Sequence, residues 1–152
     1  MIGFKLGNIA KAMQETGLLP DFIVVDGAEG GTGAAPSEFI NHVGLPMHEG
    51  LMLVHNALVG TGLRPLVKVG ASGKVASGSD IVKRIIQGAD FTMAARAMMF
   101  AVGCIQAQMC HTNRCPVGVA TQDPARTRAL DIPDKSERVY RFQKATVASA
   151  QQ

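Results

Sequence analysis

Tryptophan is absent from this chain of 152 residues, and only one tyrosine is present. Charged residues make up only 18% of the chain, and its formal net charge is only +3. Proteins that bind nucleic acid usually have a strongly basic surface, with aromatic side chains where bases stack. We therefore expect no nucleic-acid partner.

Long apolar runs and a recognisable secretory signal peptide are also missing. The most apolar stretch, residues 47–63, is interrupted by histidines, Glu49, Asn56 and glycines, whereas a membrane helix needs about 18 consecutive apolar residues. The first residues do not show a basic segment followed by an apolar segment and a cleavage site. We expect a cytoplasmic protein with no membrane partner, in which the three cysteines are ligands or reactive thiols rather than disulfides.

Apolar segments alternate between strand-like and helix-like patterns along the first two thirds of the chain. The predicted strands cover residues 3–6, 21–26, 66–69 and 90–95. Helices are predicted between them, one with Ser79 as its N-cap, and alternation of this kind is typical of an α/β fold with a parallel sheet. Three histidines, His42, His48 and His55, are interpreted as packing or capping residues.

The regular pattern ends at Cys104, which suggests three parts. Residues 1–103 carry about four βα units, residues 104–133 form a Cys-rich segment, and residues 134–152 form a terminal helix. A docking stripe is predicted on that helix, formed by Val139, Phe142, Thr146 and Val147.

Glycine-rich turns follow two neighbouring predicted strands. The first is Ala71-Ser72-Gly73-Lys74, and the second is Ala94-Ala95-Arg96, which opens a helix. Backbone N–H groups in such turns, together with a helix N-terminus, favour a phosphate group. Ordinary βα turns without a ligand are the alternative.

A second glycine-rich segment, residues 27–36, follows the predicted strand 21–26. Its glycines surround Glu29 and Thr32 and would allow a flat or anionic ligand to approach the backbone closely. We interpret this segment as the lining of a substrate pocket, with a loop of no binding function as the alternative.

All three cysteines lie in one short segment, as Cys104, Cys110 and Cys115, and Pro116 follows the last of them. Thiolates grouped in this way suit an iron–sulfur cluster, and a cluster of three irons needs three thiolates. A zinc site that includes His111 and buried cysteines without a ligand are the alternatives.

These motifs together resemble the glutamate synthase family. The resemblance rests on Asp26-Gly27-Ala28-Glu29-Gly30-Gly31-Thr32-Gly33-Ala34-Ala35-Pro36, on the Ala71-Ser72-Gly73-Lys74 turn, and on the Cys104 to Gln122 segment with its Cys110-His111-Thr112-Asn113-Arg114-Cys115-Pro116 core. It points to the carboxyl-terminal half of the FMN-binding domain, and the glycine loop is closer to the stand-alone branch because Ala28 and Glu29 stand where large glutamate synthases have histidine and aspartate.

The resemblance implies a (β/α)8 TIM-barrel type fold, of which this chain supplies the C-terminal half. It implies that FMN and a 3Fe-4S cluster take part in reducing 2-iminoglutarate, made from 2-oxoglutarate and glutamine-derived ammonia, to L-glutamate. Carried over by position, the metal ligands are Cys104, Cys110 and Cys115, the catalytic residues are Lys5 and Glu29, and the residues that bind cofactor or line the active site are Gly30, Gly31, Thr32, Ser72, Gly73, Lys74, Ala95 and Arg96.

The implied partners are an electron donor, either ferredoxin or an NAD(P)H-linked subunit, and a source of the missing half of the barrel, which would be another chain or a homo-oligomer. Two alternatives stay open. The chain would be a non-catalytic half-barrel that binds FMN or phosphate only with a partner, or a small interaction domain stabilised by zinc.

Overall fold

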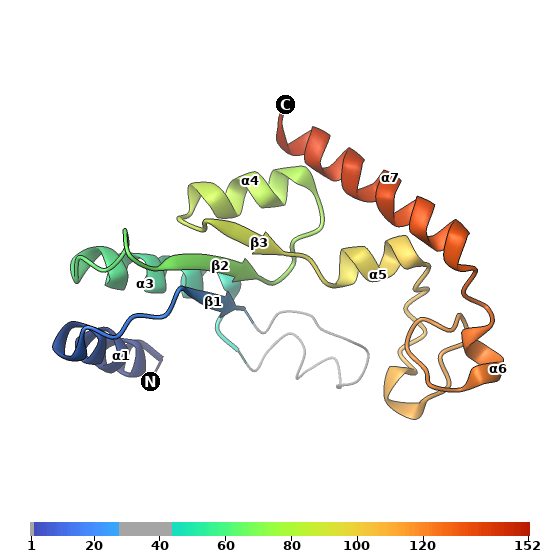
Figure 1. Cartoon of the computed structure of the whole chain (residues 1–152), viewed down its shortest axis with the longest axis horizontal. Helices are drawn as coiled ribbons and strands as arrows, with labels where there is room; N and C mark the ends of the chain where they lie inside the picture. The colour runs from blue at the N-terminus through green and yellow to red at the C-terminus, as the bar shows by residue number, and fades with distance from the viewer. Residues whose placement is uncertain (1, 28–43) are drawn as a thin grey trace.

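A computed structural model describes residues 2–27 and 44–152, with side chains described from residue 6 onward. In this part of the chain three strands form one parallel sheet, in the order β1 (Phe22–Asp26), β2 (Lys68–Ser72) and β3 (Phe91–Met93). Helices connect successive strands, as Figure 1 shows. The prediction of an α/β fold with parallel strands is confirmed.

The segment before β1 differs from the prediction. Residues 3–6 were expected to form a strand, but they belong to helix α1 (Ile2–Thr16). Leu6, Ala10 and Met13 recur at helical spacing, and this stripe packs against the core. The expectation of a strand here was wrong, because the apolar stripe continues with helical period through the whole segment.

Two helices connect the strands. Helix α3 (Met47–Gly60) leads to β2, and α4 (Gly78–Ile86) leads to β3. Helix α4 begins earlier than predicted, since Ser77 rather than Ser79 is its N-cap: the Ser77 hydroxyl accepts a hydrogen bond from the Asp80 N–H, and the Asp80 carboxylate accepts one from the Ser77 N–H. This reciprocal pair is a capping box.

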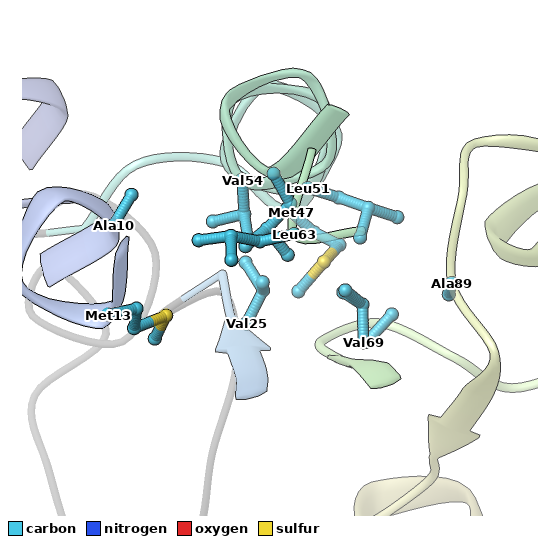
Figure 2. Packing of buried hydrophobic residues seen from close by; sticks show 11 residues of the cluster. Ala10, Met13, Val25, Met47, Leu51, Val54, Leu63, Val69 and Ala89 are labelled. Atoms are coloured by element: carbon cyan, nitrogen blue, oxygen red, sulfur yellow. The ribbon is translucent and has the colours of Figure 1, made fainter. Parts of the chain in front are cut away.

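The core lies between the sheet and α1 and α3. Alternate strand residues such as Val25 and Val69 point toward α3, which contributes the fully buried Met47 and Leu51 (Figure 2). Burial of such side chains stabilises a fold by about 1.5–3 kcal/mol each. The sheet is therefore held firmly on its helix-covered face.

The opposite face of the sheet is less well covered. Phe22, Val24 and Met93 point to that face, and their exposed fractions are 56%, 39% and 49%. Parallel sheets normally have both faces covered. No described element covers this face.

After β3 the chain first leads away from the sheet (Figure 1). Helix α5 (Arg96–Val102) leads into the Cys-rich segment, which contains the short 3-10 helix η1 (Cys110–Thr112) and helix α6 (Pro124–Thr127). The last helix, α7 (Ile132–Ala150), returns to pack against α4 and α5. It begins before residue 134, where the terminal helix was predicted to start.

Candidate functional site

The two predicted phosphate turns lie beside each other at the carboxyl edge of the sheet. Ser72 at the end of β2 pairs in register with Met93 at the end of β3, so the turns that follow these strands are neighbours. Gly73 and Lys74 have positive φ angles of 143° and 49°, which glycine adopts easily and lysine rarely does. The chain thus forms a sharp turn at this position.

The helices after these two turns begin differently. The first turn of α4 is closed by its own carboxylate, because Asp80 accepts hydrogen bonds from the N–H groups of Ala76 and Ser77. Burial alone would raise the pKa of Asp80, but the Ser77 hydroxyl, these N–H groups and Lys83 hold it below its ordinary value. Helix α5 has no such side-chain cap at Ala95.

A cavity of about 300 Å³ lies between the segments that flank the two turns and helix α7. Val75 and Ala76 follow the first turn, while Ala94 and Ala97 flank the second. Phe142 and other side chains of α7 form another part of the wall. Two predicted stripe residues, Phe142 and Thr146, therefore face a cavity beside the sheet.

All three cysteines line one small cavity, together with Met99 from α5. Cys115 is buried, with 6% of its surface exposed, while Cys104 and Cys110 are half-buried. The structure therefore brings together the three residues that the sequence selected as metal ligands.

Backbone N–H groups surround the sulfur of Cys115. Burial alone would raise the pKa of this thiol, but hydrogen bonds from the N–H groups of residues 117–120 outweigh burial and hold the pKa below its ordinary value. Stabilisation of a thiolate favours metal ligation, because the thiolate is the form that binds a metal. The surroundings of Cys115 therefore fit a metal ligand.

The segment between Cys104 and Cys110 has an unusual backbone. Gln106 and Gln108 both have positive φ angles, 55° and 54°, and the Gln106 N–H lies 3.4 Å from Cys104 Sγ, to which it donates a hydrogen bond. Non-glycine residues in this conformation often occur at ligand sites. Two of the three cysteine sulfurs thus receive hydrogen bonds from backbone N–H groups.

A site for a single metal ion is not found in residues 2–27 and 44–152, where no three His, Cys, Asp or Glu side chains are placed to hold one ion. The zinc alternative that includes His111 gains no support from this geometry.

Several residues that the sequence singled out lie either outside the described residues or in a different element from the one expected. Glu29, Gly30, Gly31 and Thr32 lie outside the described residues, as does His42. Lys5 lies in α1 rather than at the end of a strand, and α1 and the Cys-rich segment are at opposite ends of the molecule (Figure 1). The premise that placed Lys5 at a strand end was wrong.

His48 and His55 both contact polar side chains. His48 Nδ1 lies 2.8 Å from Gln87 Nε2, and His55 Nδ1 accepts a hydrogen bond from Arg64 Nε. Such contacts agree with the interpretation of these histidines as packing residues.

Comparison of the sequence with known protein families gives a match over nearly the whole chain. The family described as "Conserved region in glutamate synthase" matches residues 3–152. This chain belongs to the glutamate synthase family. The motifs that carried the resemblance were therefore interpreted correctly at the level of the family.

Individual glutamate synthases are also similar to this chain. It is 46% identical to the glutamate synthase large subunit-like protein YerD of Bacillus subtilis over 138 residues, which cover 91% of this chain and 26% of that protein. It is 42% identical to the ferredoxin-dependent glutamate synthase of Pyropia yezoensis over 80% of this chain and 8% of that protein. The archaeal-type glutamate synthase (NADPH) of Thermotoga neapolitana is 37% identical over 81% of this chain and 24% of its own length.

The chain thus spans about a quarter or less of these glutamate synthases. A crystal structure of mandelate oxidase aligns with 95% of this chain and 36% of its own, at 18% identity and a TM-score of 0.43, which is too low to assign a fold. Within the described residues no helix has both the length and the apolar character needed to cross a membrane.

Proposed function

We propose that this chain is the cluster-binding and phosphate-binding part of a glutamate synthase-like oxidoreductase that works in the cytoplasm and forms L-glutamate. One observation carries the proposal: Cys104, Cys110 and Cys115 line a single cavity, and backbone N–H groups stabilise the Cys115 thiolate. Membership of the glutamate synthase family supports it.

The three cysteines would hold a 3Fe-4S cluster, which supplies single-electron transfer when bound. The chain's own contribution is to fix three sulfurs around one cavity and to donate N–H groups to two of them. Such hydrogen bonds stabilise negative charge on the sulfurs and thereby influence the reduction potential. Met99 contributes an apolar wall.

The FMN phosphate would bind at the turns after β2 and β3. Ser72, Gly73 and Lys74 form the first turn, and Ala95 and Arg96 begin the second. The backbone N–H groups of a sharp glycine turn and the guanidinium of an arginine such as Arg96 are suited to an anion. FMN supplies hydride transfer when bound, and the chain supplies its placement.

The reaction we propose is the reduction of 2-iminoglutarate, which is formed from 2-oxoglutarate and glutamine-derived ammonia. A hydride adds to the imine carbon and a proton to its nitrogen, which yields L-glutamate. Glu29 would be a catalytic residue in this step. Gly30, Gly31 and Thr32 would line the site. Electrons would come from ferredoxin or from an NAD(P)H-linked subunit.

We further propose that the chain works with a second set of strands that completes a (β/α)8 barrel. The exposed side chains of Phe22, Val24 and Met93 on one sheet face support this, as does the lack of a further strand beside β1 or β3 in the described part of the chain. Unpaired strand edges favour pairing with other strands. Those strands would come from another chain or from a second copy.

The test is an absorption spectrum of the anaerobically purified chain, with iron, sulfide, zinc and flavin measured in the same sample. Iron near three per chain, with visible charge-transfer absorption, is the expected result. Flavin in the same sample would indicate that this chain, alone or as a dimer of two copies, can bind FMN.

Two outcomes would contradict the proposal. Colourless protein with stoichiometric zinc would favour a zinc-stabilised interaction domain. Protein that stays free of iron after reconstitution with iron and sulfide would remove the cluster site.

A further inference from the structure

Asn113 lies between two of the predicted ligands and has an unusual backbone conformation. It directly follows η1, which begins at Cys110, and it has a φ angle of 61°. Asparagine adopts this left-handed conformation more often than other non-glycine residues do. The chain reverses at Asn113 and leads back to Cys115.

The side chain of Asn113 connects this reversal to the chain beyond Cys115. Its Oδ1 accepts a hydrogen bond from the Gln122 N–H at 2.6 Å. The Thr121 hydroxyl lies 2.7 Å from the carbonyl oxygen of Asn113 and 3.0 Å from its Oδ1, so one hydrogen is shared between two acceptors. Because a backbone N–H can only donate, the contact with Gln122 fixes which end of the amide faces it.

These hydrogen bonds enclose the segment that surrounds the Cys115 sulfur. Residues 117–120, whose N–H groups stabilise the thiolate, lie between Cys115 and Thr121. Gly118 in this segment also packs closely against the carbonyl of Arg126, because an added Cβ at Gly118 would lie 2.5 Å from that oxygen. Arg126 Nη1 also donates to the carbonyl of Arg114.

We propose that Asn113 is the positioning residue that closes this loop and holds Cys110 and Cys115 at the spacing the cluster requires. The proposal rests on the cluster site described above. Asn113 does not touch the cysteine cavity itself. It acts through Thr121 and Gln122, which fix the far end of the segment that donates N–H groups to Cys115.

Three substitutions at this position separate the amide from the backbone conformation. Asn113→Asp keeps an oxygen at the Oδ1 position and serves as the conservative control. Asn113→Gly keeps easy access to the positive φ angle but removes the side chain. Asn113→Ala loses both.

The full chain would be reconstituted anaerobically with iron and sulfide, and bound iron, bound sulfide and the electron paramagnetic resonance spectrum would be measured. We expect Asn113→Gly and Asn113→Ala to lose about 10- to 100-fold in iron affinity, as is usual when a group that orients a metal ligand is removed. We expect Asn113→Asp to retain the wild-type spectrum. If Asn113→Gly kept wild-type iron content, the backbone conformation alone would suffice and the proposal would be wrong.

A second measurement needs no metal. The rate at which iodoacetamide alkylates Cys115 in metal-free protein reports on closure of the loop, because Cys115 is buried. We expect alkylation to be faster in Asn113→Gly than in the wild type and in Asn113→Asp, with Cys104 as the internal reference. Equal rates at Cys115 would contradict closure by Asn113.

The two measurements distinguish failure of this proposal from failure of the cluster site. A wild-type chain that binds no iron would overturn the cluster site, and the alkylation rates would then still decide whether Asn113 closes the loop. If the wild type binds iron and Asn113→Gly binds it equally well, only the role of Asn113 would be overturned.

Discussion

Arg64 Nη2 and Asp90 Oδ2 lie 2.7 Å apart and connect the turn before β2 to the start of β3. The same carboxylate oxygen accepts a hydrogen bond from the Val69 N–H in β2, and Arg64 also donates to the carbonyl of Gly88. Both side chains are largely shielded, with exposed fractions of 18% for Arg64 and 26% for Asp90. This network holds the amino-terminal edge of the sheet together, at the edge opposite the predicted phosphate turns.

Replacement of Asp90 by asparagine should destabilise the fold. The change removes the negative charge beside Arg64, and we expect the free energy of unfolding to fall by about 1.5–3 kcal/mol, the usual value for a hydrogen bond to a charged group. Urea unfolding near neutral pH measures this. Glu137→Gln is the control, because the Glu137–Arg141 pair is exposed and its loss should change stability by no more than about 0.5 kcal/mol. Equal effects of the two substitutions would contradict a stabilising role for Asp90.

The contribution of Asp90 should also depend on pH. Burial alone would raise the pKa of this carboxyl, but the Val69 N–H, Arg64 and Lys68 outweigh burial and hold it below 3.8. A lowered folded-state pKa gives stability that is complete above the unfolded value and is lost as pH falls through the folded value. The difference in unfolding free energy between wild type and Asp90→Asn should therefore shrink below pH 3.8. A difference that stays constant through this range would show that the charge of Asp90 is not responsible.

Gly78 allows α7 to approach α4. A Cβ at Gly78 would lie 2.5 Å from the backbone nitrogen of Ala150 and 2.7 Å from the carbonyl carbon of Ser149. Gly78→Ala should displace the end of α7 and lower the unfolding free energy by about 1–3 kcal/mol. Gly60→Ala in α3 is a matched control, since no atom lies within 4 Å of its added Cβ. Thermal unfolding of the two variants would test this, and a similar midpoint for both would contradict the close contact.

Cys110→Ser should remove cluster binding and leave flavin affinity nearly unchanged. The cysteine cavity is formed by residues 99–120, whereas the phosphate turns are formed by residues 72–74 and 95–96. Iron, sulfide and flavin would be measured after reconstitution, with Met109→Leu as a control that changes another wall of the same cavity. Equal loss of iron and flavin in Cys110→Ser would show that the two sites are not independent.

Gly73→Val should weaken flavin binding. Gly73 has a φ angle of 143°, and a Cβ there would contact Met47 and Gly27. A valine in such a conformation costs on the order of 1–2 kcal/mol, so the turn should shift and flavin affinity should fall by about tenfold or more. Gly62→Val is the control, because Gly62 also has a positive φ angle but nothing lies within 4 Å of its added Cβ. Flavin retention equal to that of the wild type would remove this turn from the site.

The sequence predicted the elements that have a strong local pattern. The apolar, β-branched run at residues 21–26 became β1, and the helical stripe that begins at Leu51 became part of α3. Prediction failed at residues 3–6, because a short apolar segment fits a strand and a helix equally well until its neighbours extend one of the two periods. It also missed Ser77 as the N-cap of α4, because Ser77 and Ser79 are both suitable capping residues and only the position of Asp80 distinguishes them.

The candidate site also has features that the sequence predicted and features that only the structure shows. The sequence by itself determined the family and the three cysteines, because residue types at fixed spacing are visible without coordinates. Only the tertiary structure decided that the three cysteines share one cavity, that residues 117–120 stabilise the Cys115 thiolate, and that Asn113 reaches Thr121 and Gln122. The physical reason is that such contacts depend on backbone conformations, such as the positive φ angle of Asn113, which reverse the chain and bring together groups that the linear order keeps apart.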